Sequence, residues 1–133
     1  MFEWKDEYSV GIRSIDGQHQ NLFRLAGELH SAMAGGQGKA AIFKTLGRLV
    51  QYTEVHFAQE ERLMRLHDYP DLAAHKAQHD ALARQVRQFQ ADFEAGRVLV
   101  TIQLLQFLKN WLENHIKGSD QKYAPYLAAR EVA

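Results

Sequence analysis

The sequence predicts an all-α fold, an up-down-up-down four-helix bundle with an irregular N-terminal arm and a short C-terminal helix. Three observations lead to this prediction. Apolar residues recur every three or four positions without strict alternation, glycine or proline interrupts that pattern at four places, and only two of the 133 residues are proline. Short connections between helices favour antiparallel neighbours. We expect one domain, 1–133, with the arm at 1–16, the bundle at 17–117 and a C-terminal segment at 118–133.

Breaks in the apolar pattern bound each predicted helix. We expect the first helix to begin near Gly17 and to end at the glycine-rich stretch 35–38. Tyr69-Pro70 separates the second helix from the third, because proline disfavours helix at the residue before it. Gly96 ends the third helix, and the stretch 117–119 ends the fourth. The apolar faces of the four helices, in chain order, are Leu22, Leu25, Leu29 and Met33; Ile42, Leu46, Leu49 and Leu63; Leu72, Leu82, Val86, Phe89 and Phe93; and Leu104, Leu108 and Trp111.

The two ends of the chain lack the long stretches of helical periodicity that the middle shows. In the arm, we expect Trp4, Val10 and Ile12 to bury their side chains against the bundle. At the other end, we expect a short helix to follow Asp120.

Composition excludes several classes of function. Sixteen basic and sixteen acidic residues give a formal net charge of zero, so nothing draws the whole chain to nucleic acid or to an anionic membrane. The absence of cysteine excludes disulfides, cysteine-ligated zinc, iron–sulfur clusters and thiol catalysis. No apolar run is long enough to cross a bilayer, and the charged N-terminus is unlike a signal peptide. We therefore expect a cytoplasmic protein without membrane insertion and, since no exposed apolar stripe is evident, a monomer.

Seven histidines stand out in a chain of this length, and five of them fall on the predicted apolar faces. Steps of three or four residues along each face lead from apolar positions to polar ones. Every predicted helix turns at least one such residue inward: His19 on the first, His56 and Glu60 on the second, His75 and His79 on the third, and His115 on the fourth. Asp120 lies five residues past the last of them. The pairs spaced i,i+4 share one helix face, so both side chains of a pair can reach one centre.

A metal centre accounts for this pattern. A buried carboxylate without a partner is strongly destabilising, and a cluster of neutral imidazoles also needs partners. A bound metal satisfies all of them together, and imidazole and carboxylate donors without thiolate suit iron, manganese or zinc. A lone histidine on an apolar face is more often a hydrogen-bonded core residue. Five histidines and two carboxylates on one set of inward faces are not expected by chance. His30 and His67 lie outside this set and are expected to be structural or solvated.

Other histidine motifs fit less well. The stretch from His75 to His79 has the spacing of a zinc-protease helix, but Lys76 stands where that helix carries its glutamate base. The ExxH pairs typical of ferritin-like di-iron enzymes do not occur in the sequence.

One pattern, H…HxxxE…HxxxH…HxxxxD, joins all seven donors and sets most of their spacings. The motifs around it are Trp4, Val10-Gly11-Ile12, Ile15-Asp16-Gly17-Gln18-His19, His56-Phe57-Ala58-Gln59-Glu60-Glu61, Tyr69-Pro70 leading to His75 and His79, and His115-Ile116 leading to Asp120. In these motifs, over nearly the whole chain, the sequence resembles the bacterial hemerythrins, which are small non-haem di-iron proteins that bind dioxygen. No donor position departs from the pattern of that family.

The resemblance implies a ligand set for two iron ions. His75, His79 and His115 would bind one iron, and His19 and His56 the other. Glu60 and Asp120 would bridge the two, together with an oxo or hydroxo ion. The first iron is then coordinatively closed, and the second keeps one open position where dioxygen would bind reversibly. The resemblance also implies an apolar oxygen pocket, although each of its residues equally fits an ordinary core position: Leu22, Phe57, Trp111 and Ile116.

Three functions stay open at this stage. The first is reversible oxygen binding for storage, delivery or sensing; the second is a di-iron oxidase or peroxidase; the third is an iron- or oxygen-sensing signalling module. The excess of histidine over glutamate donors favours an oxygen binder that is not an enzyme. A separate protein that receives the oxygen is compatible with this function.

Overall fold

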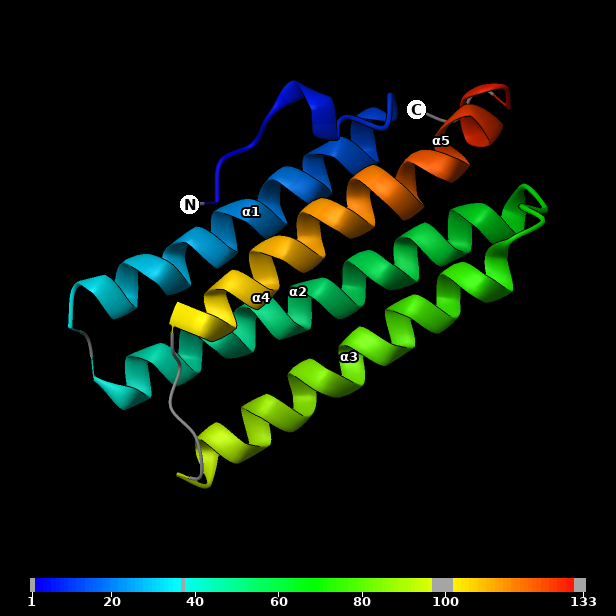
Figure 1. The fold of residues 1–133 in the computed structure, drawn as a ribbon. Helices are drawn as coiled ribbons and strands as arrows, with labels where there is room; N and C mark the ends of the chain where they lie inside the picture. Colours follow the sequence, from blue (N-terminus) through cyan, green and yellow to red (C-terminus); the bar gives the residue numbers. More distant parts are fainter. Residues whose placement is uncertain (1, 37, 97–101, 131–133) are drawn as a thin grey trace.

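The computed structural model describes residues 2–36, 38–96 and 102–130, and most of these residues are helical. Figure 1 shows four long helices side by side: α1 (Arg13–Ala34), α2 (Lys39–Leu66), α3 (Leu72–Glu94) and α4 (Ile102–Asn114). Helix α1 packs against α2 and α4, and α2 packs against α3. No strand occurs among the described residues, so the predicted all-α bundle is confirmed. None of the described helices is both long and apolar enough to span a membrane.

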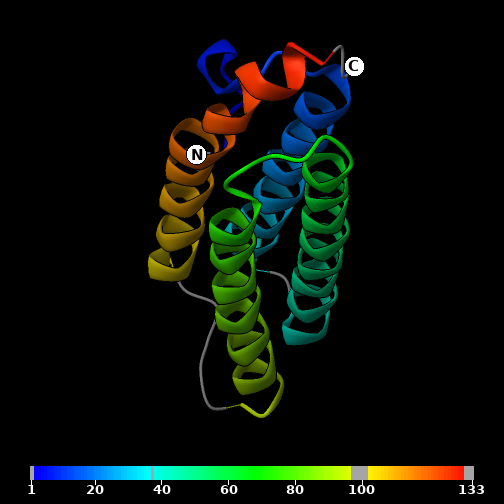
Figure 2. The same cartoon turned by 90° about the vertical axis from the view of Figure 1, so that its right-hand side faces the viewer.

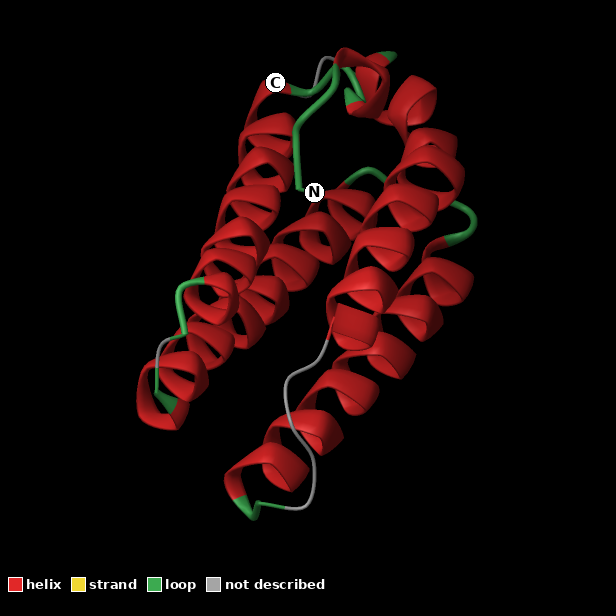
Figure 3. Ribbon diagram, turned by 60° about the vertical axis from the view of Figure 1, so that its left-hand side comes forward, coloured by secondary structure: helices red, strands yellow, loops and turns green. Residues whose placement is uncertain are grey.

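The arm and the C-terminal elements gather at one end of the bundle. The arm contains one 3₁₀ turn, η1 (Asp6–Tyr8), and α4 continues into a π-helical segment, η2 (His115–Asp120), and then into α5 (Gln121–Ala128). Figures 2 and 3 show α5 lying across this end, close to the arm and to the α2–α3 connection. Gln121 ties the two termini together, because its side-chain N–H donates to the backbone carbonyl of Glu7 at 2.7 Å.

Buried apolar residues form two clusters along the bundle. The larger one lies between the four long helices and includes Leu22, Leu29, Leu46 and Leu105. The smaller one joins the arm to the C-terminal end of α2 and to α5; its buried members are Val10, Ile12, Ile15, Met64, Tyr123, Ala124 and Leu127. All the predicted face residues either are buried or pack half-buried against one of these clusters. The predicted burial of the arm is also confirmed, with Trp4 half-buried and Val10 and Ile12 buried.

The predicted start of the first helix is wrong by four residues. The helix begins at Arg13, so the arm ends at residue 12 and not at residue 16. Asp16 does not mark the helix start but lies in the first turn, where its carboxylate accepts hydrogen bonds from the Val10 backbone N–H (2.8 Å) and the Ser9 hydroxyl (2.5 Å). This carboxylate stabilises the bend from arm to helix, and Ile15 is buried behind it.

The predicted break at 117–119 is also wrong. The chain stays helical there and widens into the π-helical η2, whose hydrogen bonds span five residues in place of four. Gly118 leaves open space at its Cα, and the Ser119 hydroxyl donates to the Gln78 side chain on α3 at 2.6 Å. This tertiary contact helps to hold the segment against α3 where local sequence indicates a turn. The short helix predicted after Asp120 is α5 and is confirmed.

Candidate metal centre

The seven donors predicted from the sequence converge inside the bundle. All of them are buried, and His19, Glu60 and Asp120 are 0% exposed. They form two groups, in each of which the ligand atoms lie within 4.8 Å of one another: His75, His79, His115 and Asp120; and His19, His56, Glu60 and Asp120. The two groups share one carboxylate, and they lie in a polar layer between the two apolar clusters. On α1, for example, His19 falls between Ile15 of the smaller cluster and Leu22 of the larger one.

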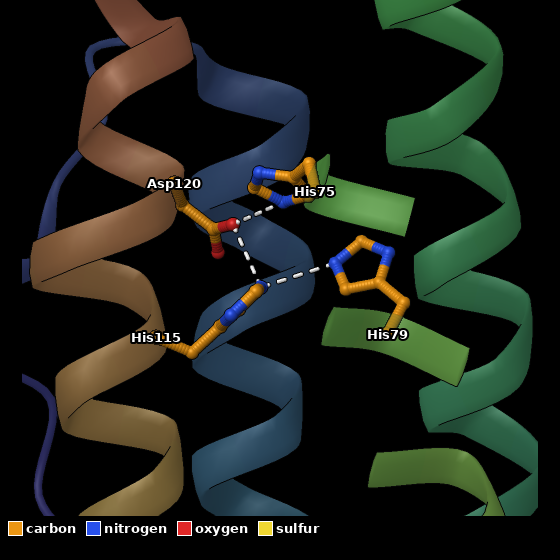
Figure 4. A group of neighbouring side chains, drawn as sticks. All are labelled: His75, His79, His115 and Asp120. Carbon is orange, nitrogen blue, oxygen red and sulfur yellow. Dashed lines mark hydrogen bonds and ion pairs between the residues drawn. The ribbon is translucent and has the colours of Figure 1, made fainter. Parts of the chain in front are cut away.

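The first group joins α3 to η2, as Figure 4 shows. The Nε2 atoms of His75 and His115 lie 2.9 and 3.0 Å from Oδ1 of Asp120. The Nε2 atoms of His79 and His115 lie 3.0 Å apart. The π-helical turn makes this arrangement, because its i to i+5 spacing brings His115 and Asp120 to the same side of the segment.

The second group joins α1, α2 and the end of η2. Nε2 of His19 lies 3.1 Å from Oδ2 of Asp120 and 3.4 Å from Oε1 of Glu60, and His56 pairs with the same Glu60 oxygen. The other Glu60 oxygen, Oε2, lies 3.6 Å from Nε2 of His75 in the first group. Each of the two carboxylates therefore presents one oxygen to each group, which is the arrangement that a pair of bridged metal ions needs.

Hydrogen bonds behind the ligand atoms orient two of the imidazoles. Nδ1–H of His56 donates to the side-chain oxygen of Gln18 at 2.6 Å, and Nδ1–H of His79 donates to a carboxylate oxygen of Glu61 at 3.0 Å. A ring that donates through Nδ1 keeps its Nε2 lone pair free for a metal, and such partners also fix the ring orientation. Gln18 and Glu61 were not predicted from the sequence, and the one available signal is that each adjoins a predicted donor.

Buried polar atoms without a hydrogen bond test whether a metal fits. Among the described residues, these atoms are Nδ1 of His19, Oε2 of Glu60, Nε2 of His75, both carboxylate oxygens of Asp120 and the hydroxyl of Tyr123. Four of these six atoms face the other donors: Oε2 of Glu60, Nε2 of His75 and both oxygens of Asp120. A buried polar atom left unsatisfied costs about 1–3 kcal/mol, and metal ions placed between the two groups would satisfy these four atoms together. The donor set of imidazoles and carboxylates fits iron.

Electrostatics also favour cations at this place. Burial lowers the pKa values of His19 and His75, but their close contacts with the carboxylates of Asp120 and Glu60 outweigh it and raise both pKa values to about 9. At Asp120, burial raises the pKa, but the surrounding imidazoles lower it to about 2. Burial likewise raises the pKa of Glu60, and the neighbouring histidines hold it well below its usual range. Both carboxylates are therefore ionised at neutral pH, and protons on His19 and His75 balance them where no metal does.

The comparison with known proteins agrees with this geometry. A family described as the Hemerythrin HHE cation binding domain matches residues 10–127. A bacteriohemerythrin of Stenotrophomonas maltophilia is 38% identical over 129 residues, which is 97% of this chain and 83% of the relative. A bacteriohemerythrin of Methylococcus capsulatus is 37% identical over 92% of this chain and 93% of its own length. The chain belongs to the hemerythrin family.

The structural comparison supports the same conclusion. The crystal structure of a wild-type hemerythrin superimposes with a TM-score of 0.90 at 35% identity, covering 95% of this chain and 97% of that one. Family, fold and donor groups together support a four-helix bundle with a non-haem di-iron centre that binds dioxygen.

The four predicted pocket residues of this hemerythrin occupy two kinds of position. Leu22 and Ile116 are 2% and 1% exposed and belong to the larger apolar cluster. Phe57 stacks on the ring of His79, with centroids 3.8 Å apart and planes inclined by 3°, and Trp111 stacks on His115 at 4.4 Å and 13°. Each stacked ring lines an outer groove, of about 540 Å³ for Phe57 and about 520 Å³ for Trp111. Each ring shares its groove with the histidine on which it stacks, His79 beside Phe57 and His115 beside Trp111.

The two remaining histidines stand apart from the donors. His30 and His67 are half-buried and belong to neither donor group. The structure therefore places both where the sequence predicted them, outside the metal centre.

Proposed function

We propose that the seven donors of this hemerythrin hold two iron ions and that the protein binds dioxygen reversibly, for storage, delivery or sensing, without acting as an enzyme. In this proposal His75, His79 and His115 hold one iron and His19 and His56 hold the other. Glu60 and Asp120 would supply oxygen ligands to both ions. The two donor groups that share these carboxylates are the observation that supports the proposal.

The unequal number of imidazoles decides where the oxygen binds. One group offers three imidazoles and the other offers two, while Glu60 and Asp120 each turn one oxygen toward each group. The iron beside His19 and His56 would therefore keep one position that no side chain fills. When bound, the two ferrous ions supply the electrons that reversible dioxygen binding requires, which no side chain here provides.

The work of the protein chain is to orient the ligands and to exclude water. Gln18 and Glu61 orient His56 and His79 through the hydrogen bonds to their Nδ1 atoms. Leu22 lies one turn from His19, and its burial supports a place for it in the wall of the oxygen pocket. We assign the rest of that wall to the other predicted apolar residues, Phe57, Trp111 and Ile116. An apolar wall of this kind keeps water and acids away from the bound oxygen.

The wider organisation is proposed on the same basis. We propose that residues 1–133 form one domain, acting as a monomer that passes oxygen to a separate protein. An oxidase or peroxidase is the less favoured function, because five of the seven donors are histidines, unlike the glutamate-rich sites of di-iron enzymes.

A titration of the di-ferrous protein with oxygen tests the proposed function. Protein loaded with Fe²⁺ without air should gain a visible charge-transfer absorption on addition of oxygen, lose it under vacuum and regain it with fresh oxygen. Zinc-loaded protein is the matched control and should stay colourless. A direct and irreversible change to the ferric form, with consumption of a co-substrate, would contradict oxygen binding and support an enzyme.

A further inference from the structure

Three tyrosines form a line of neighbouring rings that leads away from the donor groups. The Tyr123 ring lies 5.4 Å from the His75 ring, between centroids. Tyr69 meets Tyr123 edge-on at 6.3 Å, and Tyr126 meets Tyr69 edge-on at 5.3 Å. The first and last tyrosines come from α5, and Tyr69 comes from the α2–α3 connection. The line therefore exists only because α5 lies across this end of the bundle.

The inner end of the line is in a fully buried, negatively charged environment. Tyr123 is 0% exposed, and its hydroxyl has no hydrogen bond among the described residues. The charged groups that act on it most strongly are the carboxylates of Glu60 and Asp120. The ring of Tyr123 therefore lies directly beside the donor groups.

The outer end is fixed at the surface. The hydroxyl of Tyr126, which is half-buried, donates to the backbone carbonyls of His67 at 2.6 Å and Asp68 at 2.8 Å. The guanidinium of Arg130 lies over its ring, 3.4 Å from the centroid. Midway, Tyr69 lines a small groove of about 100 Å³, together with His75. These contacts hold both outer rings next to solvent.

We propose that Tyr126, Tyr69 and Tyr123 form an electron relay that supplies electrons from the surface to hydrogen peroxide reacting at the donor groups. Electron tunnelling falls off steeply with distance, so a line of neighbouring rings is faster than one long step. A phenol gives up an electron only to a strong oxidant, so the relay takes no part in ordinary dioxygen binding. It protects the buried imidazoles and the ring of Trp111, which stacks on His115 with centroids 4.4 Å apart.

The electrons and protons of this step balance. Each oxidation removes one electron and the phenolic proton from Tyr126, and the proton passes to water because this residue reaches the surface. A neutral tyrosyl radical remains, and a soluble one-electron reductant such as ascorbate restores the phenol. Two such oxidations, with two protons from solvent, convert one hydrogen peroxide into two water molecules. The relay goes beyond the proposed oxygen binding, but it rests on redox-active iron at the donor groups.

Replacement of the middle ring tests the relay. Iron-loaded wild type, Tyr69→Phe and the control Tyr52→Phe, which removes a tyrosine outside the line, are mixed with hydrogen peroxide. Radicals are measured by electron paramagnetic resonance in frozen samples, and oxidised tyrosines are located by peptide mass spectrometry, both normalised to bound iron. Phenylalanine keeps the ring packing but is not oxidised, so we expect Tyr69→Phe to lose oxidation at Tyr126. Tyr52→Phe should match wild type.

Three results would overturn the relay. The first is oxidation of Tyr126 at the wild-type level in Tyr69→Phe, and the second is the same oxidation in zinc-loaded wild type. The third is slower reduction of the ferric protein by dithionite in Tyr69→Phe. A phenol takes no part in that reaction, so a slower rate would show that the substitution disturbs the structure of the iron site. Failure of oxygen binding is distinguishable, because a protein that formed the Tyr126 radical but bound no oxygen reversibly would refute only the proposed function.

Discussion

Glu60 and Asp120 are fully buried, and each turns one oxygen toward each of the two donor groups. A buried carboxylate is tolerated only where charges or hydrogen bonds compensate it, and here imidazoles surround both side chains. Because each carboxylate serves two groups at once, the loss of either one affects both proposed iron positions. At the scale of single residues, the loss of one of these carboxylates should therefore reduce iron binding more than the loss of any one histidine.

Removal of one bridging carboxylate tests this view. Glu60→Ala should leave fewer than two irons per chain, because His56 and His19 lose a shared partner. Breaking a buried charge pair also destabilises a fold by about 3–5 kcal/mol, so the free energy of unfolding should fall. Iron analysis and thermal unfolding measure both effects, with Gln59→Ala on the same helix as the control. Full retention of iron would remove Glu60 from the proposed ligand set.

The hydrogen bond behind His79 has its own measurable effect. Glu61→Leu removes the acceptor that fixes the Nδ1–H of His79, so iron affinity should fall by about 10–100-fold. Glu54→Leu is the matched control, since Glu54 lies on the same helix but pairs with Arg87 at the surface. Competition with a chelator measures the affinity. Equal affinity in the two variants would show that Glu61 does not orient His79.

At the scale of elements, η2 decides the geometry of the centre. In an α-helix, residues five apart are rotated by about 140° from one another and cannot share a face. The wider π-helical turn brings His115 and Asp120 together, with Nε2 and Oδ1 3.0 Å apart. A single irregular turn therefore brings the carboxylate from the end of one element to the centre of all four helices.

A change in the length of this turn should disrupt the centre. An alanine inserted after Gly118 rotates Asp120 by about 100° relative to His115, so the carboxylate shared by the two groups is lost. We expect fewer than two irons per chain, with helical circular dichroism largely kept. An alanine inserted between Gly35 and Gly36, in the exposed α1–α2 turn, is the control and should keep its iron. Two irons in the first variant would show that the π-helical spacing is not required.

At the scale of the whole molecule, the polar layer separates two apolar clusters. Its buried polar groups destabilise the folded chain unless metal ions or protons compensate their charges. Metal ions that bind the folded chain and not the unfolded one stabilise it by mass action. The metal-free protein depends instead on protons shared between imidazoles and carboxylates. Its stability should therefore respond to pH in a way that the iron-loaded protein does not.

The sign of this response follows from the pKa values. The folded-state pKa values of His19 and His75 are raised to about 9, so their stabilisation is complete below pH ~6.5 and is lost as pH rises through about 9. Asp120, with its pKa lowered to about 2, stabilises above pH ~3.8 and ceases to do so as pH falls through about 2. Chelator-treated protein should melt at a lower temperature at pH 9.5 than at pH 6. A parallel decline in iron-loaded protein would contradict this explanation.

Helical periodicity was enough to predict most of the bundle and the inward direction of the donors. His56 and Glu60, like His75 and His79, are four residues apart, and a fixed helical period places such pairs on one face whatever surrounds them. Periodicity failed where tertiary contacts outweigh local signals. Gly118 predicted a turn, but the helix continues through this position, where Ser119 contacts Gln78 on α3. Asp16 predicted the start of the first helix, but its side chain bonds to the arm from within the first turn of that helix.

The sequence by itself determined the fold class, the polar positions on each apolar face and the family to which the chain belongs. These features depend on spacing along one helix, and spacing is written directly in the order of residues. Only the tertiary structure decided that a π-helical turn brings Asp120 to His115, that Gln18 and Glu61 orient two imidazoles, and that three tyrosines line up across the end of the bundle. Each of these contacts joins different elements, so it depends on how the helices dock.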